Sequence, residues 1–199
     1  MQPKLRTFTV EEYLALDEAA PQGVRLEYGD GLIYLNGQPY DPEWGWDVAL
    51  DMAGASPKHN DIASNLHFSL RSRLGDQCRI SIADMAVSVG KGKYSYPDLT
   101  VTCGDRVFND AKPAALINPT VVIEIVSPSS KARDFGDKLD LYIQIPSLLE
   151  YWIVEQEIPR ILRYVRTGGI WVVHSERGSY VASEHLSVEI SLNEIYPAE

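Results

Sequence analysis

The sequence has little cysteine and no long apolar run. Its 199 residues contain only two cysteines, Cys78 and Cys103, and these form no C-x-x-C pair. A disulfide scaffold or a thiolate zinc site is therefore not expected, and this cysteine usage fits a reducing cytoplasm. No stretch approaches the roughly 18–20 apolar residues that a membrane span needs. We expect a cytoplasmic protein with no signal peptide and no membrane partner.

Positive charge is also scarce, because 18 Lys and Arg residues face 28 Asp and Glu residues, for a net charge of −10. Such a chain is not a general coat for nucleic acid, so binding DNA or RNA requires a local basic patch or a metal ion. The P-loop, dinucleotide-binding, G-x-S-x-G and H-E-x-x-H patterns are absent as well. Their absence excludes the enzyme classes built on those patterns, and no organic cofactor is expected.

The remaining composition indicates an ordinary globular domain. Hydrophobic residues make up 45% of the chain, and the length suits a single domain spanning residues 1–199. A capping box at Thr9 predicts a helix at residues 10–20, and an apolar stripe predicts a second helix at residues 57–74. A serine cap at the start and a proline after the end predict a third helix at residues 131–145. β-branched and alternating runs predict strands at 24–28, 32–35, 78–89, 94–103, 121–126 and at short intervals from 151 to 190.

These elements predict a mixed α/β (α+β) domain built around one sheet. Residues 36–50 are rich in Pro, Gly, Asp and Trp. We expect them to form a loop that is an exposed insertion.

Glu124 is the most informative residue for function. It lies within the run 121–126, whose continuous β-branched character is typical of a central strand covered on both faces. A carboxylate there is costly unless it is paired, hydrogen-bonded or bound to metal, although a strand-end position or a buried Arg or Lys would also explain it. Asp98 starts another apolar strand after Pro97, a pair that is also a common turn former. Carboxylates on adjacent strands can meet and hold a hard cation such as Mg²⁺.

The third predicted helix supplies a candidate cation. Helical spacing places Lys138 on the arc of Tyr142 and other core-facing residues, where a lysine requires a negative partner. A lysine that reaches the domain edge, or an ion pair with Asp134, remains an alternative. Because only a short turn separates the helix from the Glu124 strand, an approach of Lys138 to Glu124 is sterically reasonable.

Two weaker candidates are His59 and Glu27. His59 begins the second predicted helix, where it could bind a ligand, contact a phosphate or form a hydrogen bond at the helix start. Glu27 alternates with Leu26 and Tyr28 and is expected on a polar face of a hairpin. The other histidines show no metal-ligand spacing and are expected to be structural: His67, His174 and His185.

The ordered set of these motifs resembles a bacterial restriction-endonuclease family within the PD-(D/E)XK nuclease superfamily. The motifs are Pro97-Asp98, the segment 121–129 (VVIEIVSPS), Asp134, Lys138, Tyr142, the segment 150–154 (EYWIV), and upstream 25–31 (RLEYGDG) with His59. The resemblance covers roughly residues 8–165 and implies a restriction-endonuclease-like fold, with a mixed central β-sheet, flanking helices and additional N- and C-terminal strands.

The resemblance also implies an endonuclease that cleaves DNA with Mg²⁺ or Mn²⁺. Asp98 and Glu124 match the metal-binding aspartate and glutamate of the family. The usual superfamily lysine, two residues after the glutamate, falls at Val126, which cannot serve. Lys138 instead matches a lysine that this family carries on the following helix, where it would orient water or stabilise phosphate charge. Glu27 and His59 are accessory candidates for the metal shell or for backbone contacts.

Two other functional classes stay open. The net charge and Val126 favour a non-catalytic nucleic-acid or protein interaction module that retains the nuclease fold. A small-molecule phosphodiesterase using the same carboxylates is the third hypothesis. A homodimer is expected with a nuclease, because cutting both strands needs two active sites and the late strands offer a free edge for pairing.

Overall fold

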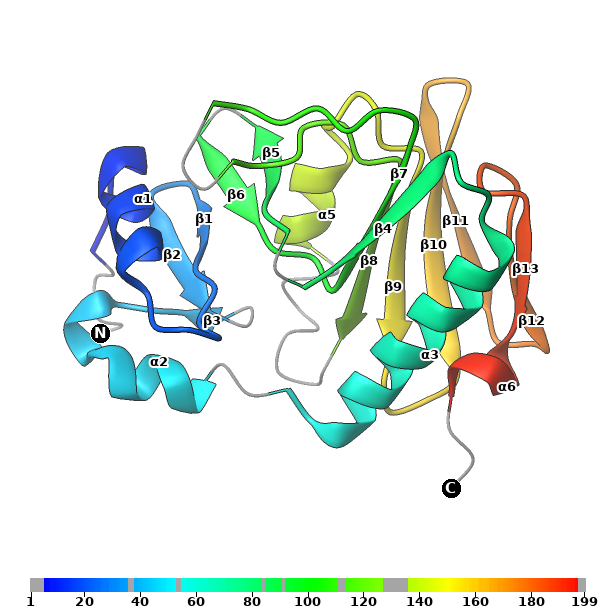
Figure 1. The fold of residues 1–199 in the computed structure, drawn as a ribbon, viewed down its shortest axis with the longest axis horizontal. Helices are drawn as coiled ribbons and strands as arrows, with labels where there is room; N and C mark the ends of the chain where they lie inside the picture. Colours follow the sequence, from blue (N-terminus) through cyan, green and yellow to red (C-terminus); the bar gives the residue numbers. More distant parts are fainter. Residues whose placement is uncertain are drawn as a thin grey trace.

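The computed structural model describes residues 6–35, 38–52, 55–83, 85–90, 92–110, 114–126 and 136–196. Its strands form three sheets, of five, six and two strands. The N-terminal elements gather on the left of Figure 1, and the six-stranded sheet with the C-terminal elements occupies the centre and right. The predicted mixed α+β architecture is confirmed, although its strands belong to more than one sheet.

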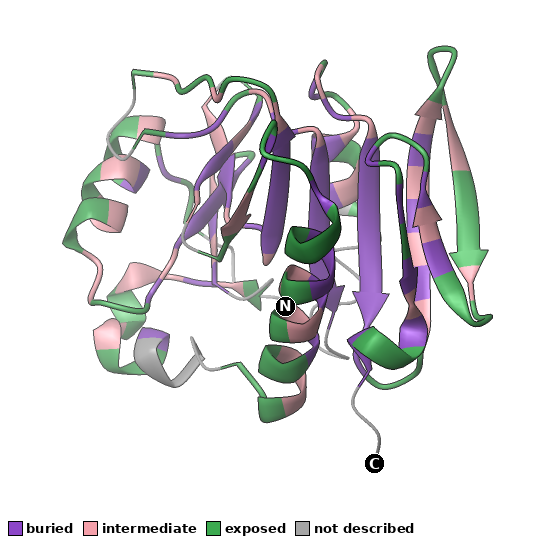
Figure 2. Ribbon diagram, turned by 45° about the vertical axis from the view of Figure 1, so that its right-hand side comes forward, coloured by how far each residue is buried: buried purple, intermediate pink, exposed green. Residues whose placement is uncertain are grey.

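The six-stranded sheet forms the core of the molecule. Its order is β11-β10-β9-β8-β7-β4. The strands are β4 Cys78–Ile82, β7 Leu99–Cys103, β8 Val121–Val126, β9 Glu150–Glu155, β10 Arg160–Thr167 and β11 Ile170–Glu176. Only the β8–β9 pair is parallel, and the other pairs are antiparallel, so the sheet is mixed. Every residue of β8 and β9 is buried (Figure 2), which explains their unbroken apolar sequence.

Alternate residues of β8 face two separate layers. Val121, Ile123 and Ile125 pack with the apolar stripe of α3, Pro57–Arg73, on one face. Val122 and Val126 pack on the other face with Tyr142 of α5, Asp137–Tyr142. Because strand side chains alternate, Glu124 projects towards the α5 layer, as the sequence predicted.

The end of the chain covers the α3 side of the sheet. A hairpin of β12, Tyr180–Ser183, and β13, Val188–Ser191, leads into the short helix α6, Leu192–Ile195. Apolar residues of this segment join the same core cluster as α3. An ion pair of 2.8 Å between Arg73 Nη2 and Glu194 Oε1 fastens α6 to the end of α3.

The N-terminal strands form a sheet of their own, in the order β3-β2-β1-β6-β5. They are β1 Glu27–Gly29, β2 Leu32–Leu35, β3 Gln38–Pro39, β5 Val87–Gly90 and β6 Lys93–Ser95. The β1–β2 pairing confirms the predicted hairpin. Helix α1, Val10–Ala19, begins at the predicted capping box of Thr9 and Glu12.

Two predicted strands are each divided between the two sheets. The expected strand 78–89 breaks after β4, where Ala83 adopts a positive φ of 47° that ends extended pairing. The expected strand 94–103 breaks between β6 and β7, since Pro97 has no N–H to donate to a ladder. The second break leaves Asp98 at the junction of the sheets.

The expectation of a loop at 36–50 is wrong for its described part. It contains β3, a 3-10 helix at Pro42–Trp44 and helix α2, Trp46–Met52. Tyr40 organises the segment, because its ring centroid lies 5.9 Å from that of Trp44 and 6.5 Å from that of Trp46. Its hydroxyl donates to the Gly45 carbonyl. Asp41 caps the 3-10 helix by accepting a hydrogen bond from the Glu43 N–H, and Pro42 occupies its first position.

Although the sequence did not lead us to expect a disulfide scaffold, Cys78 and Cys103 form a disulfide. They are register partners of the antiparallel β4–β7 pair, with Cα atoms 4.0 Å apart. Sequence spacing rules detect local cysteine motifs and miss cysteines that meet across neighbouring strands.

The predicted third helix is described only as α5, since residues 127–135 lie outside the described part of the chain. The alternative pairing of Lys138 with Asp134 therefore lies outside it too. Among the residues that the structure describes, no helix has the length and apolar character needed to cross a membrane.

Candidate active site

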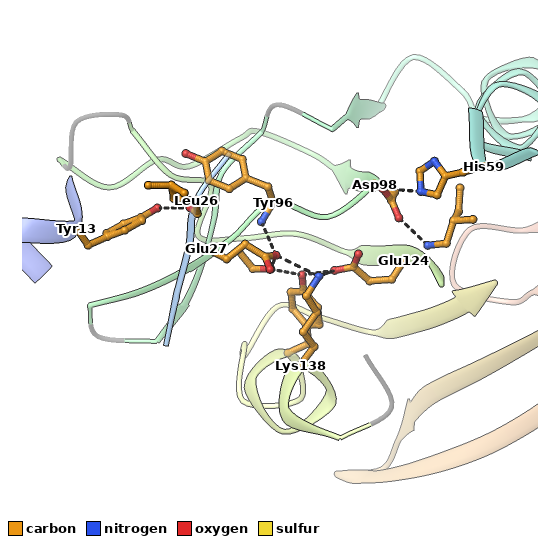
Figure 3. Close-up of polar contacts among 11 residues, drawn as sticks. Tyr13, Leu26, Glu27, His59, Tyr96, Asp98, Glu124 and Lys138 are labelled. Carbon is orange, nitrogen blue, oxygen red and sulfur yellow. Dashed lines mark hydrogen bonds and ion pairs between the residues drawn. The ribbon is translucent and has the colours of Figure 1, made fainter. Parts of the chain in front are cut away.

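Polar side chains gather where the two larger sheets meet helix α5 (Figure 3). Glu27 comes from β1, Glu124 from β8 and Lys138 from α5, and all three are buried. Asp98, just before β7, and His59, in the first turn of α3, form a pair beside them. The structure thus brings together residues from five regions that are distant in the sequence.

Lys138 links the two buried glutamates. Its Nζ lies 3.0 Å from Glu124 Oε1 and 3.1 Å from Glu27 Oε1, and the residue is only 6% exposed. Val126 shares the strand face of Glu124 but is apolar, so the ammonium group comes from α5 instead. Helix α5, which packs against β8, therefore supplies the positive charge that β8 lacks.

The hydroxyl groups of Ser95 and Tyr142 also connect Glu27 with Glu124. Ser95 Oγ lies 2.6 Å from Glu27 Oε1 and 2.8 Å from Tyr142 Oη, and Tyr142 Oη lies 2.7 Å from Glu124 Oε1. Burial, followed by the charges of Glu124 and Glu27, raises the pKa of Tyr142 well above its ordinary value, so its hydroxyl stays a donor. These three oxygen–oxygen contacts have only the two protons of the Ser95 and Tyr142 hydroxyl groups to share. All three can therefore be hydrogen bonds only when one of the two carboxyl groups carries a proton.

Both buried glutamates of this cluster share the ammonium group of Lys138. A buried charge without a partner is costly, so each of the three side chains depends on the others.

Asp98 has a defined position next to this cluster. Its Oδ2 accepts a hydrogen bond of 2.7 Å from the Ile125 N–H, and its Oδ1 lies 3.1 Å from His59 Nε2. The β7–β8 register pairs Leu99 with Ile123. Continuing that register by one residue puts Asp98 opposite Glu124, where Cβ atoms are typically about 5 Å apart and side chains share a face.

His59 is held by the start of α3 and by Asp98. Ser56 caps the helix by accepting a hydrogen bond from the His59 N–H. Burial lowers the pKa of His59, but the hydrogen bond and the charge of Asp98 together raise it above its ordinary value of 6.5. Within the described residues, the buried Nδ1 of His59 has no hydrogen-bond partner.

The structure corrects the expectation for Glu27 and adds two residues. Glu27 is 4% exposed rather than on a polar face, because β1 lies between β2 and β6 and all its residues are buried. Sequence analysis did not assign Tyr142 or Ser95 to the site. The position of Tyr142 on the arc of Lys138 was the available signal, and nothing in the sequence marked Ser95.

The donor chemistry of Asp98 and Glu124 fits a hard divalent cation, since carboxylate oxygens are the ligands that Mg²⁺ and Mn²⁺ prefer. In the described part of the chain, no three His, Cys, Asp or Glu side chains are already arranged as a metal-binding group. Both Asp98 oxygens have protein partners instead.

Comparison with known proteins places this arrangement among nuclease-like folds. A crystal structure described as "a putative nuclease belonging to DUF820" from Anabaena variabilis ATCC 29413 superposes with a TM-score of 0.67. That match has 16% sequence identity and covers 94% of this chain and 97% of the other. At this identity the likeness concerns the fold, which is a restriction-endonuclease-like fold.

The sequence itself identifies the family. Residues 10–195 match the model of the family Uma2, described as "Putative restriction endonuclease". Two uncharacterized proteins of Synechocystis sp. (strain ATCC 27184 / PCC 6803 / Kazusa) are similar. The protein sll1609 is 31% identical over 82% of this chain and 83% of its own length, and slr1290 is 32% identical over 94% and 86%. The chain belongs to the Uma2 family.

Proposed function

We propose that this protein is a divalent-metal-dependent endonuclease that hydrolyses phosphodiester bonds in DNA. The observation that carries the proposal is the buried Lys138, held between Glu27 and Glu124 beside Asp98. Titratable side chains that are buried together at a junction of elements mark a candidate functional site. Membership of a family described as "Putative restriction endonuclease", and a fold similar to that of a structure described as "a putative nuclease", support the assignment.

Asp98 and Glu124 are the proposed metal ligands. A bound Mg²⁺ or Mn²⁺ would supply positive charge at the phosphate and lower the pKa of a bound water. The Ile125 N–H fixes Asp98, and the Tyr142 hydroxyl fixes Glu124, so both carboxylates are oriented before any ligand arrives. Such pre-organisation limits the cost of assembling the site.

Lys138 is the proposed electrostatic catalyst. Its ammonium has three N–H donors, and two of its contacts are Glu27 and Glu124. We assign it the stabilisation of charge on the phosphate oxygens or the orientation of the attacking water. Glu27, fixed by Ser95 and by the Tyr96 N–H, positions Lys138. His59, paired with Asp98, is the proposed backbone contact or metal-shell residue.

A nicking assay on supercoiled DNA tests the proposal. The protein should nick DNA with Mg²⁺ or Mn²⁺, and Asp98→Asn, Glu124→Gln or Lys138→Met should each reduce the rate by about 100-fold or more. Asp140→Asn and Glu157→Gln are matched controls on exposed carboxylates and should leave the rate unchanged. RNA and short model phosphodiesters, tested in parallel, distinguish a DNA enzyme from the other phosphodiesterases. Absence of metal-dependent cleavage of every substrate would overturn the proposal.

A second candidate is a non-catalytic module that binds nucleic acid or protein through the same fold. The net charge of −10 favours this candidate, and so do the contacts that both Asp98 carboxylate oxygens already make with Ile125 and His59. Under this candidate, binding persists without metal and is unchanged by Glu124→Gln. A metal-dependent loss of binding in that variant would argue for the nuclease.

We also propose that the nuclease acts as a homodimer. Strand β11 is an edge of the six-stranded sheet. It exposes Ile170 and Val173, which are 65% and 53% accessible. An edge strand with exposed apolar residues is suited to pairing with a second copy. Sedimentation equilibrium should show a dimer that Val173→Lys weakens, and a monomer at all concentrations would contradict this part of the proposal.

A further inference from the structure

A second concave site lies away from the candidate active site. A cavity of about 660 Å³ is lined by His67, Arg71, Asp76, Cys78, Arg79 and Ile80. It adjoins the Cys78–Cys103 end of the β4–β7 ladder, whereas Asp98 precedes the Leu99 end. Four residues of strand separate the two ends, or about 14 Å.

The lining of this cavity is cationic in a molecule that is acidic overall. Arg71 and Arg79 contribute two permanent positive charges, and the acid among the lining residues is Asp76. The Asp76 carboxylate is exposed and lies 3.9 Å from Arg71 Nη2, a long contact. Arg79 donates to the Asp76 backbone carbonyl, and within the described residues no carboxylate pairs with its guanidinium. The cavity therefore attracts anions although the whole chain repels them.

The lining of the cavity includes one cysteine of the disulfide. Cys78 lines it, and Cys78 is joined to Cys103 in the disulfide between β4 and β7. Strand β4 is an edge of the sheet, so one side of the disulfide ladder has no further strand. Cys78 is 5% exposed and Cys103 is half-buried, so the disulfide lies between the core and the cavity.

We propose that this cavity binds small anionic thiols, which exchange with the Cys78–Cys103 disulfide. The incoming thiolate sulfur forms a bond to Cys78 Sγ while the Cys78–Cys103 bond breaks. The electron pair leaves on Cys103 Sγ, which takes a proton from water. A second thiolate attacks the small-molecule sulfur of the mixed disulfide and releases Cys78 as a thiolate. Overall, two small thiols are oxidised to their disulfide and the two cysteines are reduced.

The arrangement of charges explains why the thiol should be anionic. Guanidinium groups bind carboxylates through charge-assisted hydrogen bonds, which would hold a thiol that carries carboxylates. Nearby cations also stabilise thiolates, both in the attacking molecule and in the cysteine that is released. This inference does not depend on the nuclease proposal, since it concerns a different cavity and a different chemistry.

Exchange rates with three thiols of different charge test the proposal. The oxidised protein is treated with glutathione (anionic), 2-mercaptoethanol (neutral) or cysteamine (cationic), and the rates are corrected for the thiolate concentration of each. The rate with glutathione should exceed the rate with cysteamine by about threefold or more. In the variant Arg71→Gln/Arg79→Gln this preference should disappear, whereas Arg177→Gln, an exposed arginine outside the cavity, should keep it.

The site of attachment gives a second readout. In Cys103→Ser, oxidised glutathione should form a mixed disulfide on Cys78 that peptide mass spectrometry locates, and the Arg71→Gln/Arg79→Gln changes should slow its formation. An unchanged thiol preference in the arginine variant, a faster reaction with cysteamine, or a purified protein whose cysteines stay free under oxidising conditions would each overturn the proposal. The thiol comparison on the unaltered protein decides the matter even if a variant fails to fold.

Discussion

Lys138 determines the charge state of the buried cluster. Its ammonium lies between Glu27 and Glu124, and all three side chains are almost inaccessible to water. Removing one member of a buried ion pair leaves the others uncompensated, which commonly costs about 3–5 kcal/mol. The residue therefore bears on stability as well as on the proposed chemistry.

Lys138→Met should lower the free energy of unfolding by about 3 kcal/mol at pH 7. The loss should shrink in acid, where protonation of a glutamate relieves the unpaired charge. Denaturant unfolding at pH 7 and pH 5 measures both effects. Lys58→Met, at a partly exposed lysine whose Nζ lies 3.9 Å from Glu157, should change stability little. Equal effects of the two variants would contradict the buried ion pair.

His59 should titrate above its ordinary pKa of 6.5 in the metal-free protein. Burial acts in the opposite direction, so the rise depends on the hydrogen bond and charge of Asp98. Asp98→Asn should therefore move the pKa of His59 below 6.5, a reversal that NMR titration of its ring protons can follow. A pKa unaffected by this substitution would contradict the pairing.

The raised pKa of His59 also determines how the free energy of unfolding changes with pH. The folded protein holds the His59 proton more tightly than the unfolded chain does. The stabilisation by the pair is therefore complete below pH 6.5 and is lost as the pH rises through the raised pKa. In Asp98→Asn this decline in the free energy of unfolding should disappear.

At the residue level, the sequence revealed side chains whose chemistry contradicts their surroundings. A carboxylate inside an apolar strand and a lysine on a core-facing helical arc marked Glu124 and Lys138. Glu27 was misplaced because alternation predicts a polar face only when one side of a strand is solvated. Ser95 escaped detection because a serine near a strand end is common.

At the element level, a second buried polar cluster anchors the C-terminal hairpin. Glu150 of β9 accepts hydrogen bonds from Trp152, Arg163 and Ser183, and it also contacts His185 Nδ1 at 3.0 Å. Ser183 ends β12, and His185 lies in the turn before β13. Because Glu150 is fully buried, this cluster joins the hairpin to the central sheet.

Glu150→Gln should lower the free energy of unfolding by about 3 kcal/mol, because it leaves the buried Arg163 without a buried counter-charge. Hydrogen exchange should show the largest loss of protection in β12 and β13. Glu176→Gln, which removes the half-buried second partner of Arg163, is the matched control and should cost less. Loss of protection confined to other strands would contradict the anchoring role.

Elements with strong local signals were predicted well. The capping box of α1, the apolar stripe of α3 and the β-branched run of β8 each determine their element through short-range physics. The division of strands 78–89 and 94–103 between two sheets was not predicted, because pairing partners are set by tertiary contacts. The Cys78–Cys103 bond was missed for the same reason.

At the scale of the whole molecule, the candidate site lies where the five-stranded and six-stranded sheets meet. Local patterns predict strands but not which sheet each one joins, so sequence analysis alone could not place β1 and β6 beside β8. The resemblance to the nuclease family supplied the fold class that periodicity left undetermined. The family match over residues 10–195 confirms the resemblance, and the superposition with a TM-score of 0.67 confirms the fold.

The net charge of −10 predicts how the proposed nuclease would bind DNA. Few surface cations can neutralise phosphates, so the affinity for DNA should be low without metal and should fall further as salt is raised. Fluorescence anisotropy with a labelled duplex, using Ca²⁺ as a non-cleaving cation, should show tighter binding with the metal. Strong binding in its absence would favour the non-catalytic module.

The central claim is that Asp98 and Glu124 together bind a divalent cation. Titration calorimetry of the protein with Mn²⁺ tests it most directly, with Asp98→Asn, Glu124→Gln and the exposed control Asp140→Asn run alongside. The account predicts one site per chain, with the affinity reduced by about tenfold or more in each of the first two variants and unchanged in the control. Mn²⁺ binding that is absent in the unaltered protein, or equally strong in all four proteins, would contradict it.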